Sequence, residues 1–287
     1  MSGRPADGLL LVDKPAGVTS HDAVDVARRS LGERRIGHAG TLDPFATGLL
    51  VLLVGRATRL LPYVDGEPKV YEATLRFGAE TSTDDLTGEI TATAPAPDPG
   101  AIRRAIASLT GEIEQVPPAF SAKQVGGRRA HAAARRGAPL ALAPVRVVVH
   151  EWTVRELRPD EADVTVTCGG GTYVRALARD LGRLAGSAAH LVALRRVRSG
   201  AFDVADAVPL DALRAGPAPL RPALDALRTL VVDTLDAVSL ARVVRGMPVP
   251  ATAAGDRAAL VDDARALVAV AERAGEQWQP RVVLRDA

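Results

Sequence analysis

The protein has 287 residues, of which 47% are hydrophobic and 24% are charged, and its formal net charge is +2 at pH 7. This balance excludes an intrinsically disordered chain, which combines low hydrophobicity with high net charge, and the length predicts about two domains. The single cysteine, Cys168, excludes an internal disulfide and a cysteine-rich zinc site. No apolar run is long enough to span a membrane, so we expect a soluble, cytoplasmic protein without a membrane partner.

The basic residues are nearly all arginines, and many of them are adjacent in the sequence. The planar guanidinium suits phosphate oxygens and stacks on bases, which favours a nucleic-acid partner. A general preference for arginine over lysine on ordinary solvated faces explains the same composition. The pairs are Arg28–Arg29, Arg34–Arg35, Arg103–Arg104, Arg128–Arg129, Arg135–Arg136 and Arg195–Arg196.

The first predicted elements are a strand and a helix. Leu9–Val12 is typical of a short buried strand, and Thr19 with Asp22 forms the pattern of a capping box at a helix start. Residues 37–48 are dense in Gly, Thr and Pro and predict a loop. The continuous apolar run Leu49–Val54 predicts a second buried strand.

The middle of the chain predicts strands around a helix. Val70–Phe77 alternates in strand fashion, with Tyr71 on its apolar face. Asp98-Pro99 predicts a helix N-cap followed by a first-turn proline. Val145–Leu157 and Asp163–Cys168 are expected to pair as strands.

Glycine and proline divide the C-terminal third. Gly169–Thr172 predicts a tight turn before a helix, and Ala215–Pro222 marks a shift in composition. Beyond it, Leu230–Ala287 predicts short strands, turns and one short helix that ends at Gly246. The tail therefore has the size of a small β-rich domain.

Several common site chemistries are missing from the sequence. There is no GxxxxGK[ST] segment, no GxGxxG after a strand and no HExxH, so neither a nucleotide-triphosphatase nor a zinc hydrolase is indicated, and we expect no metal site. The segment that stands out is GHAGTLDPFATG at residues 37–48, where Asp43, His38 and three glycines lie close together. Glycines permit close backbone approach to a ligand. Read locally, Asp43-Pro44 is equally typical of a helix start, and His38 of a turn residue bonded to the backbone.

This segment resembles the signature loop of the TruB-type tRNA pseudouridine synthases. The resemblance covers about residues 8–205, with further family-like blocks in the same order. They are Lys14-Pro15-x-Gly17-x-Thr19-Ser20, Lys69-Val70-Tyr71, Ser82-Thr83-Asp84-Asp85-x-x-Gly88, Pro117-Pro118-Ala119-Phe120-Ser121-Ala122, Gly171-Thr172-Tyr173-Val174-Arg175, and His190-Leu191-x-x-Leu194-Arg195-Arg196.

The resemblance implies an α+β fold with two domains. Residues 1–225 would form a pseudouridine synthase catalytic domain around a mixed, largely antiparallel sheet. Residues 230–287 would form a small PUA-like, β-barrel-like RNA-binding domain. The short N-terminus and tail favour an enzyme that acts without an obligate protein partner, and we expect a monomer.

The implied activity is isomerisation of the T-loop uridine, position 55 of tRNA, to pseudouridine. The partner would be the T-arm stem-loop of tRNA. Its target base must leave the folded loop, so base flipping is expected. The reaction needs no redox change and no group donor, and the resemblance implies no cofactor.

The resemblance also implies roles for individual residues. Asp43 matches the catalytic carboxylate, and Arg175 matches the arginine paired with it. Tyr71 matches the tyrosine stacked against the flipped uracil; its alternative is a core aromatic on a strand face. For Arg175 the alternative is an exposed residue in the first turn of a helix.

Three more residues match substrate contacts of the family. His38 matches a histidine that fills the space left by the flipped base. Tyr173 and Leu194 match residues lining the base pocket, and ordinary core packing is the alternative for Leu194. Lys14 is interpreted as structural support through Pro15.

The sequence departs from the family pattern in one region. Phe120 stands in place of a tyrosine, Lys123 lies one position early with Gln124 at the usual lysine position, and His131 replaces an aromatic residue. These changes concern local RNA contacts or packing. The competing hypotheses are a guide-RNA-dependent, dyskerin-like synthase subunit, a tRNA-folding chaperone, and an RNA-binding scaffold without chemistry.

Overall fold

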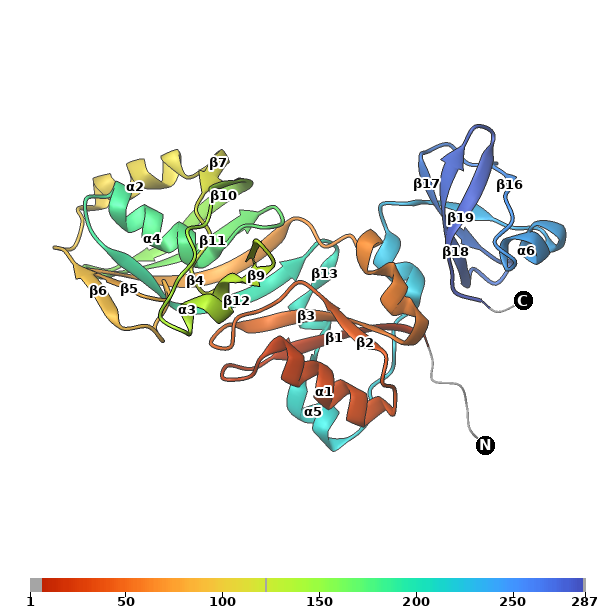
Figure 1. Cartoon of the computed structure of the whole chain (residues 1–287), viewed down its shortest axis with the longest axis horizontal. Coiled ribbons are helices and arrows are strands. Elements are labelled where there is room, and N and C mark those ends of the chain that lie inside the picture. The colour runs from red at the N-terminus through yellow and green to blue at the C-terminus, as the bar shows by residue number, and fades with distance from the viewer. Residues whose placement is uncertain (1–6, 122, 286–287) are drawn as a thin grey trace. The chain divides into compact units, whose positions relative to one another are not determined.

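The computed structural model describes residues 7–121 and 123–285, and within them the chain forms two compact units (Figure 1). Unit 1 contains Met1–Pro44, Gly48–Gly66 and Ala201–Ala287, and unit 2 contains Phe45–Thr47 and Glu67–Gly200. Ala122 of the family-like blocks lies outside the described residues, as do residues 1–6 of the predicted catalytic domain and 286–287 of the predicted PUA-like domain.

Unit 1 begins with strands buried on both faces. β1 (Gly8–Lys14) pairs antiparallel with β3 (Thr47–Val54) along its whole length, from Gly8 opposite Val54 to Lys14 opposite Gly48. The short strand β14 (Val208–Pro209) adds to β1 in parallel. Burial on both faces explains why the apolar runs are continuous and do not alternate, and both predicted strands are confirmed.

Helix α1 (Ser20–Leu31) follows the local rules for helix ends. The Thr19 hydroxyl accepts from the Asp22 N–H, and the Asp22 carboxylate accepts from the Thr19 N–H, so the predicted capping box is confirmed. The helix stops at Gly32, whose φ of 64° lies in the left-handed region that favours glycine. Helix α5 (Leu210–Ala215) packs beside α1 (Figure 1).

The prediction of a loop over residues 37–48 was wrong at both ends. β2 (Ile36–Ala39) pairs antiparallel with β3, placing His38 opposite Leu52, and β3 itself begins at Thr47. Only residues 40–46 are irregular. The glycines concealed this pairing, because backbone hydrogen bonding to a buried neighbouring strand does not depend on the side chain at Gly37.

The C-terminal part of unit 1 forms a separate curled sheet with the strand order β15-β17-β18-β19-β16 (Figure 1). Its core surrounds the fully buried Trp278. The short helix α6 (Ala237–Val243) ends before the predicted Gly246, because Val244–Gly246 form a turn in which the Gly246 N–H donates to the Val243 carbonyl. The strands are Val231–Thr234, Arg257–Val261, Leu267–Ala274, Gln277–Val283 and Val249–Pro250, in that spatial order.

Unit 2 is built on a sheet with the order β12-β4-β11-β10-β7, in which every neighbour is antiparallel. The predicted pairing of β10 (Val145–Leu157) with β11 (Glu161–Cys168) is confirmed. β4 (Lys69–Phe77) is a central strand, and its alternate residues from Tyr71 to Phe77 are buried, as expected. β12 is Ala189–Ser199 and β7 is Gly111–Gln115.

Helix α4 (Val174–Leu184) packs against β12, and α2 (Pro99–Ser108) lies beside α4 (Figure 1). Asp98 caps α2 and Pro99 opens it, as predicted. Smaller elements complete the chain. They are β5 (Ala79–Thr81), β6 (Ile90–Thr93), β8 (Gln124–Val125), β9 (Arg128–Arg129), α3 (Ala130–Ala134), β13 (Phe202–Asp203) and the 3-10 turns η1 (Gly55–Tyr63), η2 (Val204–Asp206) and η3 (Ala223–Leu227). In residues 7–121 and 123–285, no helix has the combined length and apolarity that crossing a membrane requires.

Candidate active site

The chain just before Asp43 is held by the first residue of α1. The Leu42 N–H donates to Ser20 Oγ at 2.9 Å, and Ser20 Oγ donates to the Leu42 carbonyl at 3.1 Å. Ser20 and Leu42 are both buried. Because the hydroxyl both accepts and donates, it satisfies the buried N–H and carbonyl of a residue that lies in no strand. Ser20 therefore fixes the backbone that leads into Asp43.

The chain just after Asp43 is held by the turn that follows β1. The Pro44 carbonyl accepts from the Gly17 N–H at 2.8 Å and faces Lys14 Nζ at 3.4 Å. The fully buried Lys14 also donates to the carbonyls of Pro15 at 2.9 Å and Val18 at 2.6 Å. A buried ammonium needs such partners to offset its desolvation. The structural role expected for Lys14 through Pro15 is confirmed, and it extends to the loop that carries Asp43.

Asp43 lies in the irregular stretch between these two attachments, and its side chain is half-buried. The alternative interpretation of Asp43-Pro44 as a helix start is wrong, because β3 begins at Thr47 and no helix intervenes. His38 is half-buried in β2, so it is a strand residue and not part of a turn. Both side chains belong to unit 1.

In unit 2, Tyr71 and Leu194 lie on neighbouring strands. Leu194 of β12 is opposite Ala73 of β4, two residues from Tyr71. Because directly opposite residues of an antiparallel pair share a face, and because side chains alternate along a strand, Leu194 and Tyr71 project from the same face. Both are buried, at 7% exposure each. The Leu194 carbonyl is 3.5 Å from the hydroxyl of Thr47, the first residue of β3.

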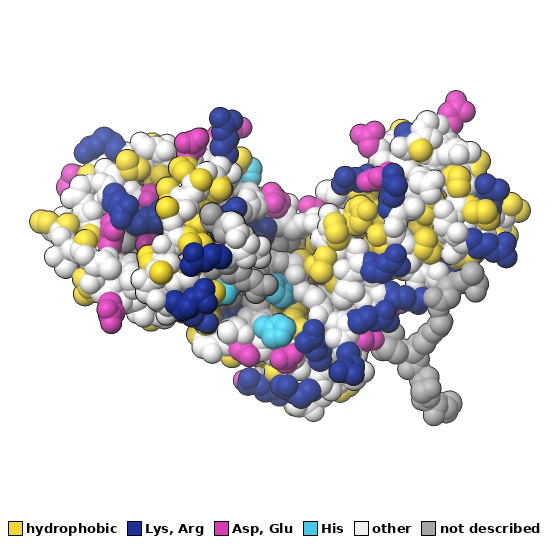
Figure 2. Space-filling view, viewed as in Figure 1, with side chains coloured by type: hydrophobic (Ala, Val, Ile, Leu, Met, Phe, Trp, Pro, Cys, Tyr) yellow, Lys and Arg dark blue, Asp and Glu magenta, His cyan; other side chains and the backbone are white. Residues whose placement is uncertain are grey.

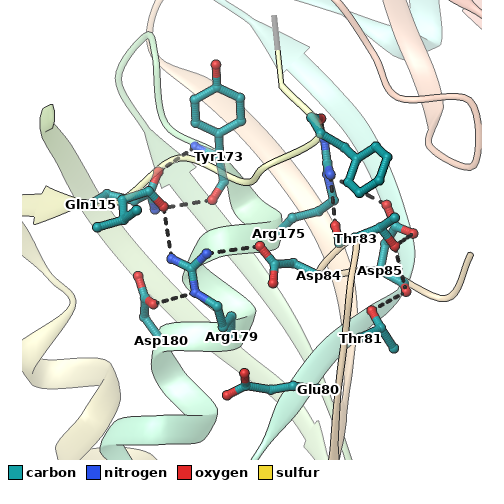
Figure 3. A network of polar contacts seen from close by, with 12 residues as sticks. Glu80, Thr81, Thr83, Asp84, Asp85, Gln115, Tyr173, Arg175, Arg179 and Asp180 are labelled. Carbon is teal, nitrogen blue, oxygen red and sulfur yellow. Dashed lines mark hydrogen bonds and ion pairs between the residues drawn. The ribbon is translucent and has the colours of Figure 1, made fainter. Parts of the chain in front are cut away.

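Arg175, in the first turn of α4, is buried with 4% exposure, so the alternative of an exposed helix residue is wrong. Its Nη1 donates to the Thr83 carbonyl at 2.8 Å and its Nη2 to the Phe120 carbonyl at 3.0 Å (Figure 3). Its Nε lies 3.7 Å from Asp85 Oδ2. Arg175 is therefore a buried guanidinium held by two backbone carbonyls and one carboxylate.

The loop between β5 and β6 presents the groups that hold Arg175. Asp85 Oδ1 accepts from the Thr83 hydroxyl at 2.7 Å and from the N–H and hydroxyl of Thr87 at 2.9 and 2.6 Å. Its other oxygen is thereby turned toward Arg175. Gly88 is required by space, since a Cβ there would lie 2.5 Å from the Thr83 hydroxyl. The Ser82–Gly88 block is therefore a folded turn that aims a carbonyl and a carboxylate at α4.

The backbone of Tyr173 is held by a buried amide. The Tyr173 N–H donates to Gln115 Oε1 at 2.9 Å, and Gln115 Nε2 donates to the Tyr173 carbonyl at 3.2 Å. Gln115 is fully buried, while Tyr173 is half-buried. Figure 3 shows the Tyr173 phenol ring extending away from this amide. Gln115 thus fixes the backbone at the entry into α4.

Sequence reasoning missed a ladder of ion pairs along α4. Arg175, Arg179 and Arg183 recur every four residues and therefore share one helix face. Their partners are Asp85 at 3.7 Å, Asp84 at 3.0 Å and Glu80 at 2.6 Å, respectively. The arginine spacing was visible in the sequence, but the acids lie about a hundred residues earlier, and their facing position is a tertiary fact.

The three ion pairs along α4 differ in how deeply they are buried. The exposed fraction of the arginine side chain rises from 4% at Arg175 to 10% at Arg179 and 59% at Arg183. Burial raises the pKa of Asp84 above its ordinary value, although the positive charge of Arg179 opposes the shift. Burial also raises the pKa of Cys168 to about 11, so this thiol is not a candidate nucleophile at neutral pH.

The departures from the family pattern lie in a loop that closes on itself. The half-buried Phe120 contributes its carbonyl to Arg175, a contact that does not depend on its side chain. The His131 N–H donates to the Ser121 carbonyl at 3.1 Å, and His131 Nδ1 lies 3.2 Å from the same oxygen. The Lys123 carbonyl accepts from Ala130, and Gln124 belongs to β8.

The structure places the predicted residues in two groups. Tyr71 and Leu194 share a sheet face in unit 2, where the network of Figure 3 fixes Tyr173 and Arg175. Asp43 and His38 come from unit 1. The pairing of Asp43 with Arg175 stays a prediction. Among residues 7–121 and 123–285, no three His, Cys, Asp or Glu side chains gather so as to hold a metal ion.

Comparison with known proteins gives consistent results. Residues 28–174 match the model of the TruB family pseudouridylate synthase N-terminal domain, and residues 175–239 match that of the tRNA pseudouridylate synthase B C-terminal domain. The chain is 46% identical to tRNA pseudouridine synthase B of Thermobifida fusca (strain YX), covering 97% of this chain and 98% of that protein. It is 45% identical to the protein of the same name from Nocardia farcinica (strain IFM 10152), covering 98% and 94%.

A solved structure supports the fold. The crystal structure of a Cbf5-Nop10-Gar1 complex contains a chain that matches with a TM-score of 0.72 at 23% identity, covering 97% of this chain and 85% of that one. At this identity the likeness concerns the fold alone. It confirms the predicted class, a mixed α+β pseudouridine synthase fold, and the curled C-terminal sheet is consistent with a PUA-like domain.

Proposed function

Because the chain belongs to the TruB family of pseudouridylate synthases, we propose that it converts the T-loop uridine of tRNA, at position 55, to pseudouridine, with Asp43 as the catalytic carboxylate. The observation that carries this proposal is the complete signature segment, in which Leu42 is hydrogen-bonded to the buried Ser20 and the Pro44 carbonyl to the buried Lys14. A catalytic carboxylate needs a fixed position, and these attachments supply one.

The reaction is an isomerisation. The bond between C1′ of the ribose and N1 of uracil breaks, the base turns, and C1′ bonds to C5. The proton on C5 leaves and N1 gains one, so the atoms balance without a donor or an oxidant. These steps require an ionised carboxylate, a group that takes the C5 proton, and a pocket that holds the free base while it turns.

We assign the carboxylate to Asp43. An Asp carboxylate forms covalent intermediates or stabilises positive charge only when it is ionised, and a nearby guanidinium favours that form even where burial opposes it. The family resemblance pairs Asp43 with Arg175. The supporting observation is that Arg175 is held in the interior by backbone carbonyls and Asp85, which fixes the position of its charge.

We assign the base pocket to Tyr71, Leu194 and Tyr173, with His38 filling the space that the flipped base leaves. Flipping costs a few kcal/mol of stacking, which contacts in the pocket must offset. An aromatic ring beside an aliphatic side chain on one sheet face provides a flat apolar surface for uracil, and the positions of Tyr71 and Leu194 support this role. Tyr71 is also the candidate to take the C5 proton.

The substrate in this proposal is the T-arm stem-loop of tRNA. Figure 2 shows Lys and Arg side chains, with Asp and Glu side chains among them, over the region of α1 and α5, and basic side chains of this kind bind phosphates. We propose that the enzyme acts as a cytoplasmic monomer without an obligate protein partner. The likeness to a Cbf5 chain does not favour a guide-dependent enzyme, because at 23% identity it concerns the fold alone.

The test is tritium release from a tRNA transcript labelled with [5-³H]uridine. Wild type and Asp43→Asn are compared on the normal transcript and on one with cytidine at the T-loop target. Release by wild type alone, and only from the normal transcript, is expected. Failure of wild type to release tritium from any tRNA, with binding intact, would overturn the proposal in favour of a chaperone. Release by Asp43→Asn would overturn the role of Asp43.

A further inference from the structure

Arg179 is a buried cation that the proposed mechanism does not use. It is 8% exposed, and each of its nitrogens has a partner (Figure 3). Nη1 donates to Asp84 Oδ2 at 3.0 Å, Nη2 to the Val116 carbonyl at 2.9 Å, and Nε to Asp180 Oδ1 at 2.9 Å. Burying a guanidinium is costly even when it is paired, so stability alone is a poor reason for its position.

One contact of Arg179 leads to the groups that hold Arg175. Asp84 lies between Thr83, whose carbonyl accepts from Arg175 Nη1, and Asp85, whose carboxylate faces Arg175 Nε. Asp84 has a φ of 59°, in the left-handed region that a non-glycine residue rarely occupies. The ion pair with Arg179 therefore holds the loop at the residue whose backbone adopts the left-handed conformation.

A second contact of Arg179 leads to the group that holds Tyr173. Val116 directly follows Gln115, whose amide hydrogen-bonds both the N–H and the carbonyl of Tyr173. The Val116 side chain is 42% exposed, so packing does little to fix this residue. The hydrogen bond from Arg179 to its carbonyl restrains the end of β7 next to Gln115.

We propose that Arg179 is a positioning residue that ties the loop supporting Arg175 to the strand end supporting Tyr173. The inference rests on the proposed function, in which Arg175 and Tyr173 serve the reacting uridine. Both supports belong to segments distant in sequence, and one planar guanidinium with separate donors can fix their spacing. A lysine cannot, because its compact ammonium lacks that fork.

The next arginine of the ladder supplies a matched control. Arg183 pairs with Glu80 through Nε at 2.7 Å and Nη2 at 2.6 Å, on the same face of the same helix. Its side chain is 59% exposed, and its partner Glu80 lies in β5, outside the Ser82–Gly88 turn and outside β7. Arg183→Met therefore removes an ion pair of the same helix face while Arg179 keeps its contacts with Asp84 and Val116.

The experiment compares full-length wild type with Arg179→Met, Arg179→Lys, Asp84→Asn and Arg183→Met. Thermal unfolding establishes that each variant is folded at the assay temperature. Filter binding gives the Kd for tRNA, and tritium release with enzyme in excess gives the single-turnover rate constant. If Arg179→Met does not fold, Arg179→Lys and Asp84→Asn, which keep most of the side-chain volume, carry the comparison.

We expect the Arg179 variants and Asp84→Asn to lose a factor on the order of 10 to 100 in rate constant, as misplacement of reacting groups does, with Kd nearly unchanged. Arg183→Met should react like wild type. Rate constants equal to that of Arg183→Met would overturn the inference, as would weakened binding at an unchanged rate constant. An inactive wild type would instead refute the proposed function, so the two failures are distinguishable.

Discussion

The hydrogen bonds between Ser20 and Leu42 give a direct test of how Asp43 is positioned. Ser20→Ala removes the group that accepts from the Leu42 N–H at 2.9 Å and donates to its carbonyl at 3.1 Å. Both peptide groups then lack a partner in a buried place. A typical buried hydrogen bond contributes about 1 kcal/mol net, so we expect a loss of roughly 2 kcal/mol. For a chain of this size that lowers Tm by about 5 °C.

The activity should fall further than stability explains. Leu42 directly precedes Asp43, and a displacement of this peptide moves the carboxylate. We expect the single-turnover rate constant for tritium release to drop about 10-fold or more, while the Kd for tRNA stays close to that of wild type. Both quantities are measured well below the Tm of the variant, where all of the protein is folded.

Ser30→Ala is the control, because it removes a hydroxyl from the same helix that donates to the Gly216 carbonyl at 2.9 Å, far along the chain from Asp43. It should lose stability and keep its rate constant. If Ser20→Ala is destabilised but reacts as fast as Ser30→Ala, the attachment of Leu42 does not position the carboxylate, and the reasoning is wrong.

Further substitutions test the fold. The Asp233 carboxylate accepts from the Trp278 indole N–H and from two backbone N–H groups. Burial raises the pKa of Asp233, but these hydrogen bonds and the one from the Thr252 hydroxyl outweigh burial and lower the pKa below its ordinary value. The stabilisation from this carboxylate is therefore present above the ordinary pKa of about 3.9 and is lost as the pH falls through the pKa of the folded state. Asp233→Asn should therefore lower the free energy of unfolding in urea by about 1–3 kcal/mol at pH 7 and by less at pH 3, and an equal loss at both would contradict this. Gly182→Ala places a Cβ 2.5 Å from the Ala189 backbone nitrogen, and calorimetry should show a loss of about 1–3 kcal/mol; no change in Tm would mean that α4 shifts freely. Thr19→Ala removes the capping box and should cost about 1 kcal/mol by the same measurement, and restoration by Thr19→Ser would confirm the cap as the cause.

Local chemistry explains which elements were predictable. The capping box at Thr19 and the Asp98-Pro99 start of α2 involve residues a few positions apart, and both formed as expected. The alternation in β4 reflects burial on one face, which the sequence records directly. The strand β2 was missed because its pairing with β3 is set by a neighbour across the sheet and not by its own glycine-rich residues.

The family resemblance predicted the residues of the candidate site, but the sequence did not predict the distant groups that hold those residues in place. The motifs identified Tyr173 and Arg175, but nothing local shows that Gln115 and Thr83, respectively, approach them from segments some 60 and 90 residues away. Hydrogen bonds between a side chain and a distant backbone group leave no periodic pattern. The only feature of the sequence that pointed to Arg179 was its spacing of four residues from Arg175. This spacing is ambiguous, because surface helices use it for solvent-exposed pairs.

The division of the chain between the units has a consequence for its synthesis. Residues 67–200 run without interruption through unit 2, whereas unit 1 is assembled from separate segments. The early strand β1 pairs with β14 and hydrogen-bonds through Leu9 to Arg221, and both partners come late in the chain. During translation the sheet around β4 is complete once residue 200 has left the ribosome. The apolar strands β1 and β3 emerge earlier and lack these later partners in the meantime. Since exposed apolar strands favour aggregation, we expect the nascent chain to be most prone to aggregate while unit 2 is being made.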